Sequence, residues 1–263
     1  MIGEITEDRA NKARHEETVK GLYQDTEVAQ NYIDERLRWS WWRHLHQMQV
    51  AKVNRVIARR RPARVLEIAP GPARLTAEVS GVSDGVMVEA SPQMIEVATG
   101  RLEEAGRMAG WRIHEGSAFE LDAVGGGFDF CYTFRFIRHF EAPERERMYR
   151  EIHRALNPGG LVMFDLVGRE LRDKIEAAKG GESRGLDVYD ATYSDASEIG
   201  AEMAAVGFET VELTPVLKHF FLQSSISYTL DHRLPAVSRV LVNALDGVPS
   251  SHPLEWIGLF RKA

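Results

Sequence analysis

Between residues 63 and 167, short apolar runs alternate with segments whose apolar residues recur at helical spacing. Four of these runs have the length and character of buried strands; they cover residues 63–69, 85–90, 128–134 and 160–167. Strands that alternate with helices predict a parallel sheet with helices on both faces. Ligands of such sheets bind at the carboxyl ends of the strands, so the residues that follow each run are candidates for a site.

The segments between the runs have clear helix signals. Ser91 and Pro92 form a good N-cap and first-turn pair. Apolar residues then follow at intervals of four: Met94, Ala98 and Leu102. The helix expected after Pro143 has the same spacing at Met148, Ile152 and Leu156. Both segments therefore predict helices with one apolar face.

The two ends of the chain are less regular. Residues 27–60 have a helical pattern, and residues 194–208 predict another helix. Two strands near the C-terminus enclose a mostly helical insert. The sequence accordingly divides into an N-terminal helical segment, an α/β core, an insert and a closing strand, over residues 1–60, 61–216, 217–251 and 252–263.

The composition limits the classes of function. A chain of 263 residues with 44% hydrophobic content can bury one large core. The formal net charge of −6 argues against a nucleic-acid partner, whose binding would need a basic face. The lone Cys131 rules out an intrachain disulfide and a cysteine-cluster metal site. No run approaches the roughly 20 apolar residues of a membrane span, and the charged N-terminus has no signal-peptide pattern. We expect a cytoplasmic protein without a membrane partner.

The turn after the first strand differs from a phosphate-binding loop. The sequence VLEIAPGPARLT, residues 65–76, contains one glycine and two prolines, whereas a pyrophosphate needs several glycines whose amides close around the anion. Glu67 lies near the end of the first strand, and Glu89 near the end of the second, close to the roughly 20-residue spacing from Gly71 expected of a nucleoside site. A carboxylate in the position of Glu89 can accept hydrogen bonds from both hydroxyls of a ribose. The pattern favours a nucleoside with an amino-acid tail and no phosphates.

In this region the sequence resembles the class I S-adenosylmethionine-dependent methyltransferases, in particular their small-molecule, type 11-like branch. The resemblance covers residues 65–167 and rests on five motifs in the family's order: EIAPGPAR, VEASPQM, GSAFEL, FDFCYTFRFIRHF and LNPGGLVMFDLV. The sequence departs from the family where Ala69 and Ala73 replace glycines and where Ser117 replaces a frequent aspartate. The resemblance implies an α/β fold with a doubly wound, mostly parallel, seven-stranded, Rossmann-like sheet. It also implies an N-terminal helical lid and a helical insert before the last strand.

The resemblance further implies a binding site for S-adenosylmethionine. The methionine end would contact the first turn, the end of the strand over residues 128–134 and the N-terminal helix: Glu67, Ala69, Pro70, Gly71, Thr133, Tyr32 and Arg36. The ribose would contact Glu89. The adenine would lie against residues that follow the strand over residues 85–90 and against the motif GSAFEL: Ala90, Met94, Ser117, Ala118 and Phe119. Because Ser117 is neutral, we expect its contact with the adenine amine to be weaker than that of an aspartate.

His139 and Arg135 are the best-placed candidates for catalysis, because they follow the strand over residues 128–134, where the methyl group would lie. Histidine titrates near neutrality and could take a proton from a phenol, an enol or an amine. The alternative is that His139 packs locally. Arg135 could hold a carboxylate or phosphate of the substrate with two hydrogen bonds, or pair with an acid of the chain itself.

Two clusters of aromatic and histidine residues could enclose an apolar or aromatic substrate, although core packing explains each of them as well. One lies in the expected lid: Trp39, Trp41, Trp42, His44 and His46. The other lies in the insert: His219, Phe220, Phe221, Tyr228 and His232. No pair of histidines has a carboxylate at a metal-ligand spacing, so we expect no catalytic metal.

These patterns favour an enzyme that moves a methyl group from S-adenosylmethionine to an oxygen, nitrogen or carbon atom of a small, aromatic or apolar metabolite. Two alternatives keep the fold: a non-catalytic module that binds S-adenosylmethionine or S-adenosylhomocysteine, and a nicotinamide-dependent enzyme, which the glycine-poor turn disfavours. The acidic charge disfavours RNA methylation, and the segment CYTF lacks the Asn-Pro-Pro-Tyr-type signature for planar amines. The sequence contains no feature that supports or excludes a protein as the methyl acceptor. The acceptor atom, the use of a base and the oligomeric state, including a homodimer, stay open.

Overall fold

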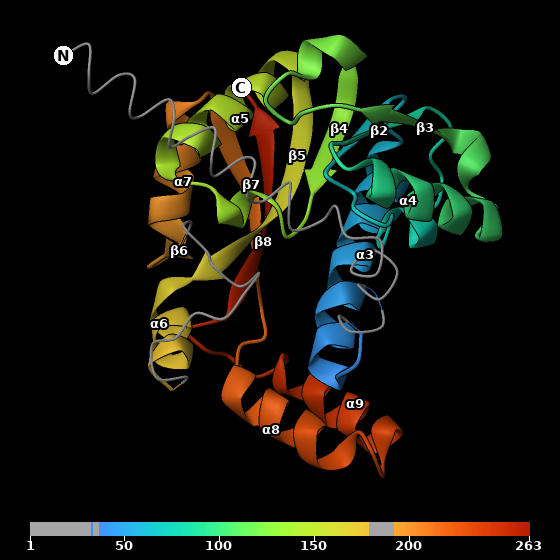
Figure 1. The fold of residues 1–263 in the computed structure, drawn as a ribbon. Coiled ribbons are helices and arrows are strands. Elements are labelled where there is room, and N and C mark those ends of the chain that lie inside the picture. The colour runs from blue at the N-terminus through green and yellow to red at the C-terminus, as the bar shows by residue number, and fades with distance from the viewer. Residues whose placement is uncertain (1–32, 34–36, 179–191) are drawn as a thin grey trace, which may run out of the picture.

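In the computed structural model, the described part of the chain comprises residues 33, 37–178 and 192–263. It forms a twisted sheet with helices packed on both faces (Figure 1). This arrangement confirms the predicted doubly wound α/β fold. Tyr32 and Arg36, which were expected to approach the cofactor from the N-terminal helix, lie outside the described residues.

The order of the strands places a switch point in the middle of the sheet. In the described part of the chain, seven strands pair side by side in the order β3 (Trp111–Glu115), β2 (Gly85–Glu89), β1 (Val65–Ile68), β4 (Phe128–Thr133), β5 (Leu156–Gly168), β8 (Glu255–Lys262) and β7 (Phe208–Val216). The pairs from β3 to β5 are parallel, and β8 is antiparallel to both of its neighbours. The short β6 (Thr192–Tyr193) pairs with the end of β5. The strand order reverses between β1 and β4, which is where ligands of such sheets bind.

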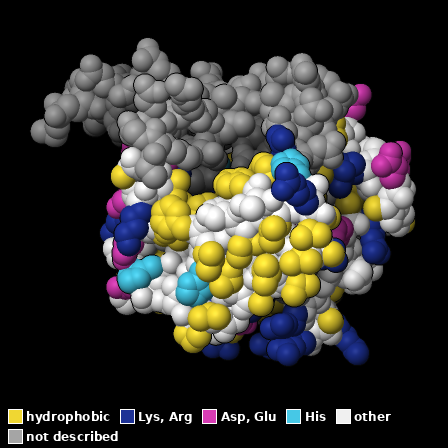
Figure 2. All heavy atoms as spheres, turned by 90° about the horizontal axis from the view of Figure 1, so that it is seen from below, with side chains coloured by type: hydrophobic (Ala, Val, Ile, Leu, Met, Phe, Trp, Pro, Cys, Tyr) yellow, Lys and Arg dark blue, Asp and Glu magenta, His cyan; other side chains and the backbone are white. Residues whose placement is uncertain are grey.

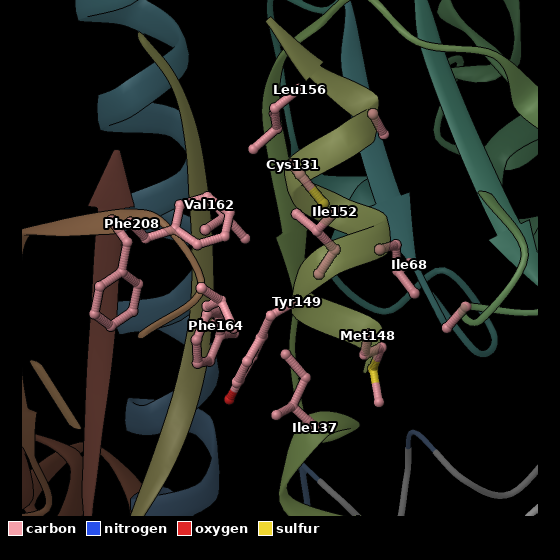
Figure 3. Close-up of a cluster of buried hydrophobic side chains, with 14 of the residues drawn as sticks. Ile68, Cys131, Ile137, Met148, Tyr149, Ile152, Leu156, Val162, Phe164 and Phe208 are labelled. Atoms are coloured by element: carbon pink, nitrogen blue, oxygen red, sulfur yellow. The ribbon is translucent and has the colours of Figure 1, made fainter. Parts of the chain in front are cut away.

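Helices cover the two faces of the sheet through separate apolar clusters. On one face, α3 (Ser40–Arg60) and α4 (Pro92–Glu104) pack against the strands. On the other, α5 (Ala142–Ala155) and α7 (Ala196–Ala205) do so. Figure 3 shows the second cluster, in which the rings of Tyr149 and Phe164 stack with their centroids 5.5 Å apart. Burial of these apolar side chains is the main force that holds helix and sheet together.

The start of α4 lies where the sequence predicts it. The hydroxyl oxygen of Ser91 accepts a hydrogen bond from the amide of Met94 at 3.3 Å, and Pro92 occupies the first turn. Met94, Ala98 and Leu102 are buried, which confirms the predicted apolar face. Because this cap follows the end of β2 directly, it also fixes the backbone at that end of the strand.

The insert between β7 and β8 forms a helical hairpin of α8 (Phe220–Leu230) and α9 (Pro235–Leu245). Both helices contact α3, and Figure 1 shows them below the sheet, beside the start of α3. Since β7 runs in the same direction as β5, the hairpin leaves the sheet at the edge where β1, β2 and β4 end. The helix α6 (Arg169–Ala178) follows β5 from that edge too.

Candidate active site

A cavity of about 470 Å³ opens at the carboxyl ends of β1, β2 and β4. Its volume lies within the range of roughly 300–1,000 Å³ that small-molecule sites occupy. Part of the wall comes from the turn after β1 and from the ends of β2 and β3, and the rest from residues 134–140, which follow β4. The cavity therefore lies at the switch point of the sheet, where a ligand was expected.

The turn after β1 has a repeating backbone conformation. Ala69, Gly71 and Ala73 have φ angles of 50°, 57° and 55°, so every second residue lies in the left-handed region. This region costs a residue with a Cβ atom roughly 1–2 kcal/mol. The turn therefore has the conformation of a glycine-rich loop, although alanine occupies two of the three positions. A Cβ atom added to Gly71 would meet no atom within 4 Å, so the backbone here borders open space of the cavity.

Glu89 joins the turn after β1 to the end of β2. Its Oε2 atom accepts a hydrogen bond from the amide of Gly71 at 3.0 Å, and its Oε1 atom accepts from the amides of Ala90 and Ser91 at 2.9 and 3.0 Å. Burial raises the pKa of Glu89, while these three bonds favour the charged form and oppose the rise. A carboxylate offers about four lone-pair sites, so the amides leave acceptor capacity at the cavity wall. The side chain thus fits the hydroxyls of a ribose.

Glu67 contributes a second, more deeply buried carboxylate to the wall. Its Oε2 atom accepts hydrogen bonds from the hydroxyl of Tyr132, at 2.9 Å, and from the hydroxyl of Thr76. Burial raises the pKa of Glu67 to about 7, although both hydroxyl donors and the nearby Arg74 partly oppose the rise. An approaching cation would lower this pKa and favour the charged form of Glu67. This property suits the ammonium group of an amino-acid tail.

Arg74 also lines the cavity, and residues of α3 hold its guanidinium. The guanidinium donates hydrogen bonds to Nδ1 of His46 at 2.6 Å and to Oε1 of Gln49 at 2.8 Å. Because arginine is always a donor, His46 is neutral here and donates from Nε2 to Glu78 at 2.6 Å. Burial is the largest cause that lowers the pKa of His46, and the positive charge of Arg74 lowers it further. Arg74 was not among the predicted site residues. Its place directly after the turn is the feature of the sequence that could have indicated a role in the site.

The segment after β4 forms an aromatic wall. Phe134, Phe136 and Phe140 line the cavity, and the rings of Phe136 and Phe140 lie 5.0 Å apart. Half-buried His139 lies in the same wall, in the short 3-10 turn Ile137–His139. The imidazole is thus placed among apolar rings, where an apolar or aromatic ligand would be in contact with it.

Arg135 contacts both the cavity and the protein interior. Its φ angle is 63°, and its amide donates a hydrogen bond to Oδ1 of Asp165 at 2.7 Å. The guanidinium lies 4.4 Å from the ring centroid of Trp42 and 3.9 Å from a carboxylate oxygen of Glu255. A pair with an acid of the chain is therefore present. The alternative, a clamp on the substrate, stays a prediction.

Arg138 supports this wall through a buried ion network. Its side chain, only 1% exposed, pairs with Asp165 of β5 and with Glu255 of β8, the latter at 2.9 Å. Both carboxylates are buried as well. Because Asp165 also accepts from the amide of Arg135, the network fixes the segment that contains His139. No local pattern in the sequence indicates this network, because its members lie far apart in the chain.

Most of the predicted site residues meet in the cavity. The predicted residues in its wall are Glu67, Ala69, Pro70, Gly71, Glu89, Ala90, Met94, Ser117, Ala118, Phe119, Arg135 and His139. Thr133 is buried at the end of β4, and it is not among the lining residues. The role expected of its carbonyl oxygen stays a prediction, as do the roles of the lining residues toward a cofactor.

The aromatic clusters of the expected lid and of the insert contact each other rather than the cavity. Trp41 stacks on Trp42 with a centroid distance of 4.3 Å and meets the ring of Phe220 at 5.1 Å. Nε2 of His44 lies 2.6 Å from the carboxylate of Asp246, which follows α9. In the described part of the chain, no residue of the insert lines the cavity. A substrate-binding role for the insert stays a prediction.

The described part of the chain contains neither a candidate metal centre nor a candidate membrane span. Among residues 33, 37–178 and 192–263, no three histidine, cysteine, aspartate or glutamate side chains are grouped so that they could hold a metal ion. Over the same residues, no helix is long and apolar enough to cross a membrane.

Residues 65–160 match the model of a protein family described as "Methyltransferase domain". The match spans the turn after β1, the end of β2 and the aromatic wall after β4. A curated relative, phosphoethanolamine N-methyltransferase 2 of Caenorhabditis elegans, is 25% identical over 140 residues. These residues are 52% of this chain but only 30% of that protein, so the two share less than a third of the relative's length.

Solved structures of low sequence identity have the same fold. Magnesium protoporphyrin IX methyltransferase (ChlM) from Synechocystis PCC 6803, with bound S-adenosylhomocysteine, matches with a TM-score of 0.64 and 12% identity over 94% of this chain and 100% of that one. The N-methyltransferase NodS from Bradyrhizobium japonicum WM9, also with S-adenosylhomocysteine, matches with a TM-score of 0.54 and 12% identity over 84% of this chain and 87% of that one. The [4+2]-cyclase SpnF matches with a TM-score of 0.52 and 19% identity over 76% of this chain and 75% of that one.

Residues 65–160, fewer than half of the chain, thus match a methyltransferase domain, and the fold around them is that of solved methyltransferases. The two solved methyltransferases hold S-adenosylhomocysteine, and the cavity of this chain fits the corresponding cofactor, S-adenosylmethionine. Glu67 and Glu89 provide carboxylates for a cationic tail and a ribose, and the space beside Gly71 is open. The cavity is thus the candidate active site.

Proposed function

We propose that this protein transfers the methyl group of S-adenosylmethionine to an oxygen, nitrogen or carbon atom of a small, aromatic or apolar metabolite. The observation that carries the proposal is one cavity with two unlike walls. Glu67 and Glu89 lie in one wall, and the phenyl rings of residues 134–140 lie in the other. The polar wall suits an adenosine with a charged tail, and the aromatic wall suits an apolar acceptor.

The polar wall supports contacts at both ends of the cofactor. Glu89 would accept hydrogen bonds from the ribose hydroxyls, and ionised Glu67 would pair with the ammonium group. The small residues Ala69 and Gly71 allow the backbone of the turn to come close to the ligand. When bound, S-adenosylmethionine supplies an electrophilic methyl group on a positively charged sulfur.

The chain's own part in the reaction is mainly to orient the reactants. An in-line displacement gains most from proximity and orientation. The rings of Phe134, Phe136 and Phe140 would hold a flat acceptor and keep water away from it. A neutral ring nitrogen of His139, in the same wall, would take the proton that a hydroxyl or amine acceptor loses. Arg135 would hold an acidic group of the acceptor.

A methyl-transfer screen tests this proposal. The protein is incubated with S-adenosylmethionine that carries an isotopically labelled methyl group and with a panel of phenols, amines and enols, and the products are followed by mass spectrometry. We expect a labelled product together with an equal amount of S-adenosylhomocysteine, and the loss of both in Glu89→Ala. Binding of the cofactor without a labelled product across the panel would contradict methyl transfer and favour the non-catalytic alternative. Proteins of this fold include a cyclase, so that outcome would redirect the search to other reactions.

A further inference from the structure

The α8–α9 hairpin has most of its large apolar side chains on the outside, although Phe220, Ile226 and Val242 pack against the core. A surface helix normally buries its apolar face and exposes polar residues. In this hairpin the buried side chains are mostly polar: Gln223, Ser224, Ser227, Ser238 and Val242. The exposed ones are mostly apolar, each between 41% and 63% exposed: Phe221, Leu222, Tyr228, Val237, Val240 and Leu241. The pattern indicates that the outer face meets an apolar environment.

These side chains form one concentrated surface. Apart from Val211 of β7, the large hydrophobic side chains that are exposed in the described residues all lie between residues 221 and 248. Figure 2, seen from below, shows yellow hydrophobic side chains gathered over much of this face. Scattered apolar residues are ordinary on a protein surface, but a contiguous patch marks an interaction site.

The exposed charges of the hairpin have one sign. Arg233 and Arg239 are exposed and form no ion pair among the described residues. The two acids of this segment, Asp231 and Asp246, have side chains that are only 6% and 9% exposed. Asp231 faces inward, where it accepts hydrogen bonds from the amide and hydroxyl of Ser40 at 2.6 and 2.5 Å. In a chain of net charge −6, a surface with only basic exposed charges is a local exception.

A basic hollow of about 540 Å³ adjoins the apolar face at the turn between the two helices. Its wall combines three arginines and one acid with aromatic and neutral groups, and it includes Arg38, Arg43, Arg239, Asp231, Trp39 and His232. Asp231 pairs with Arg43 at 3.5 Å, so the arginines outnumber the acid. The ring of Trp39 lies 4.8 Å from that of Tyr228 and 5.4 Å from that of His232. Cations and amphipathic aromatic rings beside an apolar surface are typical of groups that lie at the level of lipid headgroups.

We propose that the α8–α9 hairpin docks on the surface of a lipid bilayer that contains anionic lipids. The apolar side chains enter the boundary between headgroups and acyl chains, while Arg233 and Arg239 contact lipid phosphates. Trp39 and Tyr228 lie at the interface. This proposal departs from the expectation that the protein has no membrane partner. That expectation rested on the lack of an apolar run long enough to span a membrane, and docking on the surface does not need such a run.

A second copy of the chain fits this surface less well. A symmetric contact through the hairpin would bring the same patch of both copies together. Arg233 and Arg239 of the two copies would then approach each other, and the described face offers no exposed acid to pair with them. An anionic bilayer has the opposite charge and therefore complements both features of the surface.

The hairpin and the active-site cavity share one edge of the sheet. The hairpin follows the end of β7, and the cavity lies at the ends of β1, β2 and β4, which point the same way. Between them, Trp42 contacts Arg135 of the cavity wall at 4.4 Å, and its neighbour Trp41 meets Phe220 of α8 at 5.1 Å. A bilayer docked on the hairpin therefore lies on the same side of the molecule as the cavity.

Sedimentation with vesicles tests the inference. The full chain is mixed with vesicles of phosphatidylcholine alone or of phosphatidylcholine with phosphatidylglycerol. We expect binding to the anionic vesicles that weakens as salt is added, because ions screen the attraction. Replacement of Arg233 and Arg239 by glutamate should lower the partition coefficient by at least roughly 25-fold, since each arginine near such a surface contributes about fivefold. Val240→Asp combined with Leu241→Asp should lower it at least roughly tenfold.

Two matched variants outside the hairpin serve as controls. Val211→Asp places the same charge on the exposed valine of β7, and Arg60→Glu reverses an exposed arginine at the far end of α3. Neither should change vesicle binding by more than about twofold. Thermal unfolding and S-adenosylhomocysteine affinity should match the wild type in all four variants.

Three results would overturn the inference. The wild type could stay in the supernatant with anionic vesicles. The hairpin variants could sediment as the wild type does. Light scattering without vesicles could show a dimer that Val240→Asp with Leu241→Asp dissociates, which would assign the face to a second copy. None of these results depends on methyl transfer.

Discussion

The amide of Gly71 donates a hydrogen bond of 3.0 Å to Oε2 of Glu89. This bond joins the turn after β1 to the end of β2, and both segments line the cavity. Because the same carboxylate also accepts from the amides of Ala90 and Ser91, its position is set before any ligand arrives. A preorganised group binds a ligand with a smaller loss of conformational freedom. The two residues together define the nucleoside end of the site.

Gly71→Ala should lower the free energy of unfolding by about 1 kcal/mol, because alanine is disfavoured at the left-handed φ angle of this turn. No atom lies within 4 Å of the added Cβ, so a clash does not contribute. Ala69→Gly, at a φ angle of 50°, is the reverse change and should leave stability equal or higher. Urea denaturation of both variants provides the measurement. Equal stability of Gly71→Ala and the wild type would contradict the left-handed conformation.

Glu67 should make the protein less stable as the pH rises from about 4.5 to about 7. The folded state keeps the proton of Glu67 up to a pKa of about 7, whereas the unfolded chain releases it near 4.5. Over this window the folded state binds more protons, so the free energy of unfolding falls with pH, by about 3 kcal/mol in all. Above the window this group adds no further change.

The variant Glu67→Gln isolates this effect, because glutamine keeps an acceptor for Tyr132 and cannot ionise. We expect it to remove the loss of stability that Glu67 causes between about pH 4.5 and 7. Urea denaturation across that range gives the two profiles. If the profiles of variant and wild type are parallel, the pKa of Glu67 is not raised in the folded state.

Arg138→Leu should be strongly destabilising, by about 3–5 kcal/mol, because it removes the cation that two buried carboxylates share. Asp165 would lose this ion pair, and Glu255 would keep, among the described cations, only the more distant Arg135, at 3.9 Å. The matched control is Arg150→Leu, whose pair with Glu146 is exposed and should contribute no more than about 0.5 kcal/mol. Thermal or urea denaturation compares the two. A similar small loss in both variants would contradict a structural role for the buried network.

His139→Gln should lower kcat by roughly 100-fold or more, for an acceptor that loses a proton on transfer, and should change KM little. The acid limb of the wild-type rate profile, which reflects protonation of the base, should disappear in the variant. Steady-state kinetics across pH provides both readouts. An unchanged kcat and an unchanged profile would instead mean that His139 only packs in the wall.

The fold was largely predictable because its signals are local. The apolar runs that became β1, β2, β4 and β5 are contiguous, and the cap at Ser91 needs only its own helix. The strand β3 was not named from the sequence, because its burial is mixed and its apolar pattern is weak. The turn after β1 was found because Glu67 and Gly71 lie within one short motif.

Contacts between distant segments were not predictable in the same way. Arg74 and His46 are 28 residues apart, and Arg138 and Glu255 are 117 apart. Their pairing depends on how α3 packs on the sheet and on where β8 lies within it. No local pattern in the sequence encodes either arrangement. The hairpin was predicted as a helical insert, but its reversed burial was not, because apolar residues at helical spacing give the same signal whichever way they face.

A nucleoside bound at Glu89 is the central feature of the candidate active site. Calorimetry of S-adenosylhomocysteine with the wild type, with Glu89→Ala and with a control, Glu120→Ala, measures this, because Glu120 is exposed and outside the cavity. We expect micromolar binding that falls at least roughly tenfold in Glu89→Ala, about 1.4 kcal/mol, and is unchanged in Glu120→Ala. Equal affinity in the wild type and in a folded Glu89→Ala protein would contradict a ribose contact at Glu89. No binding to the folded wild type would contradict the cofactor site itself.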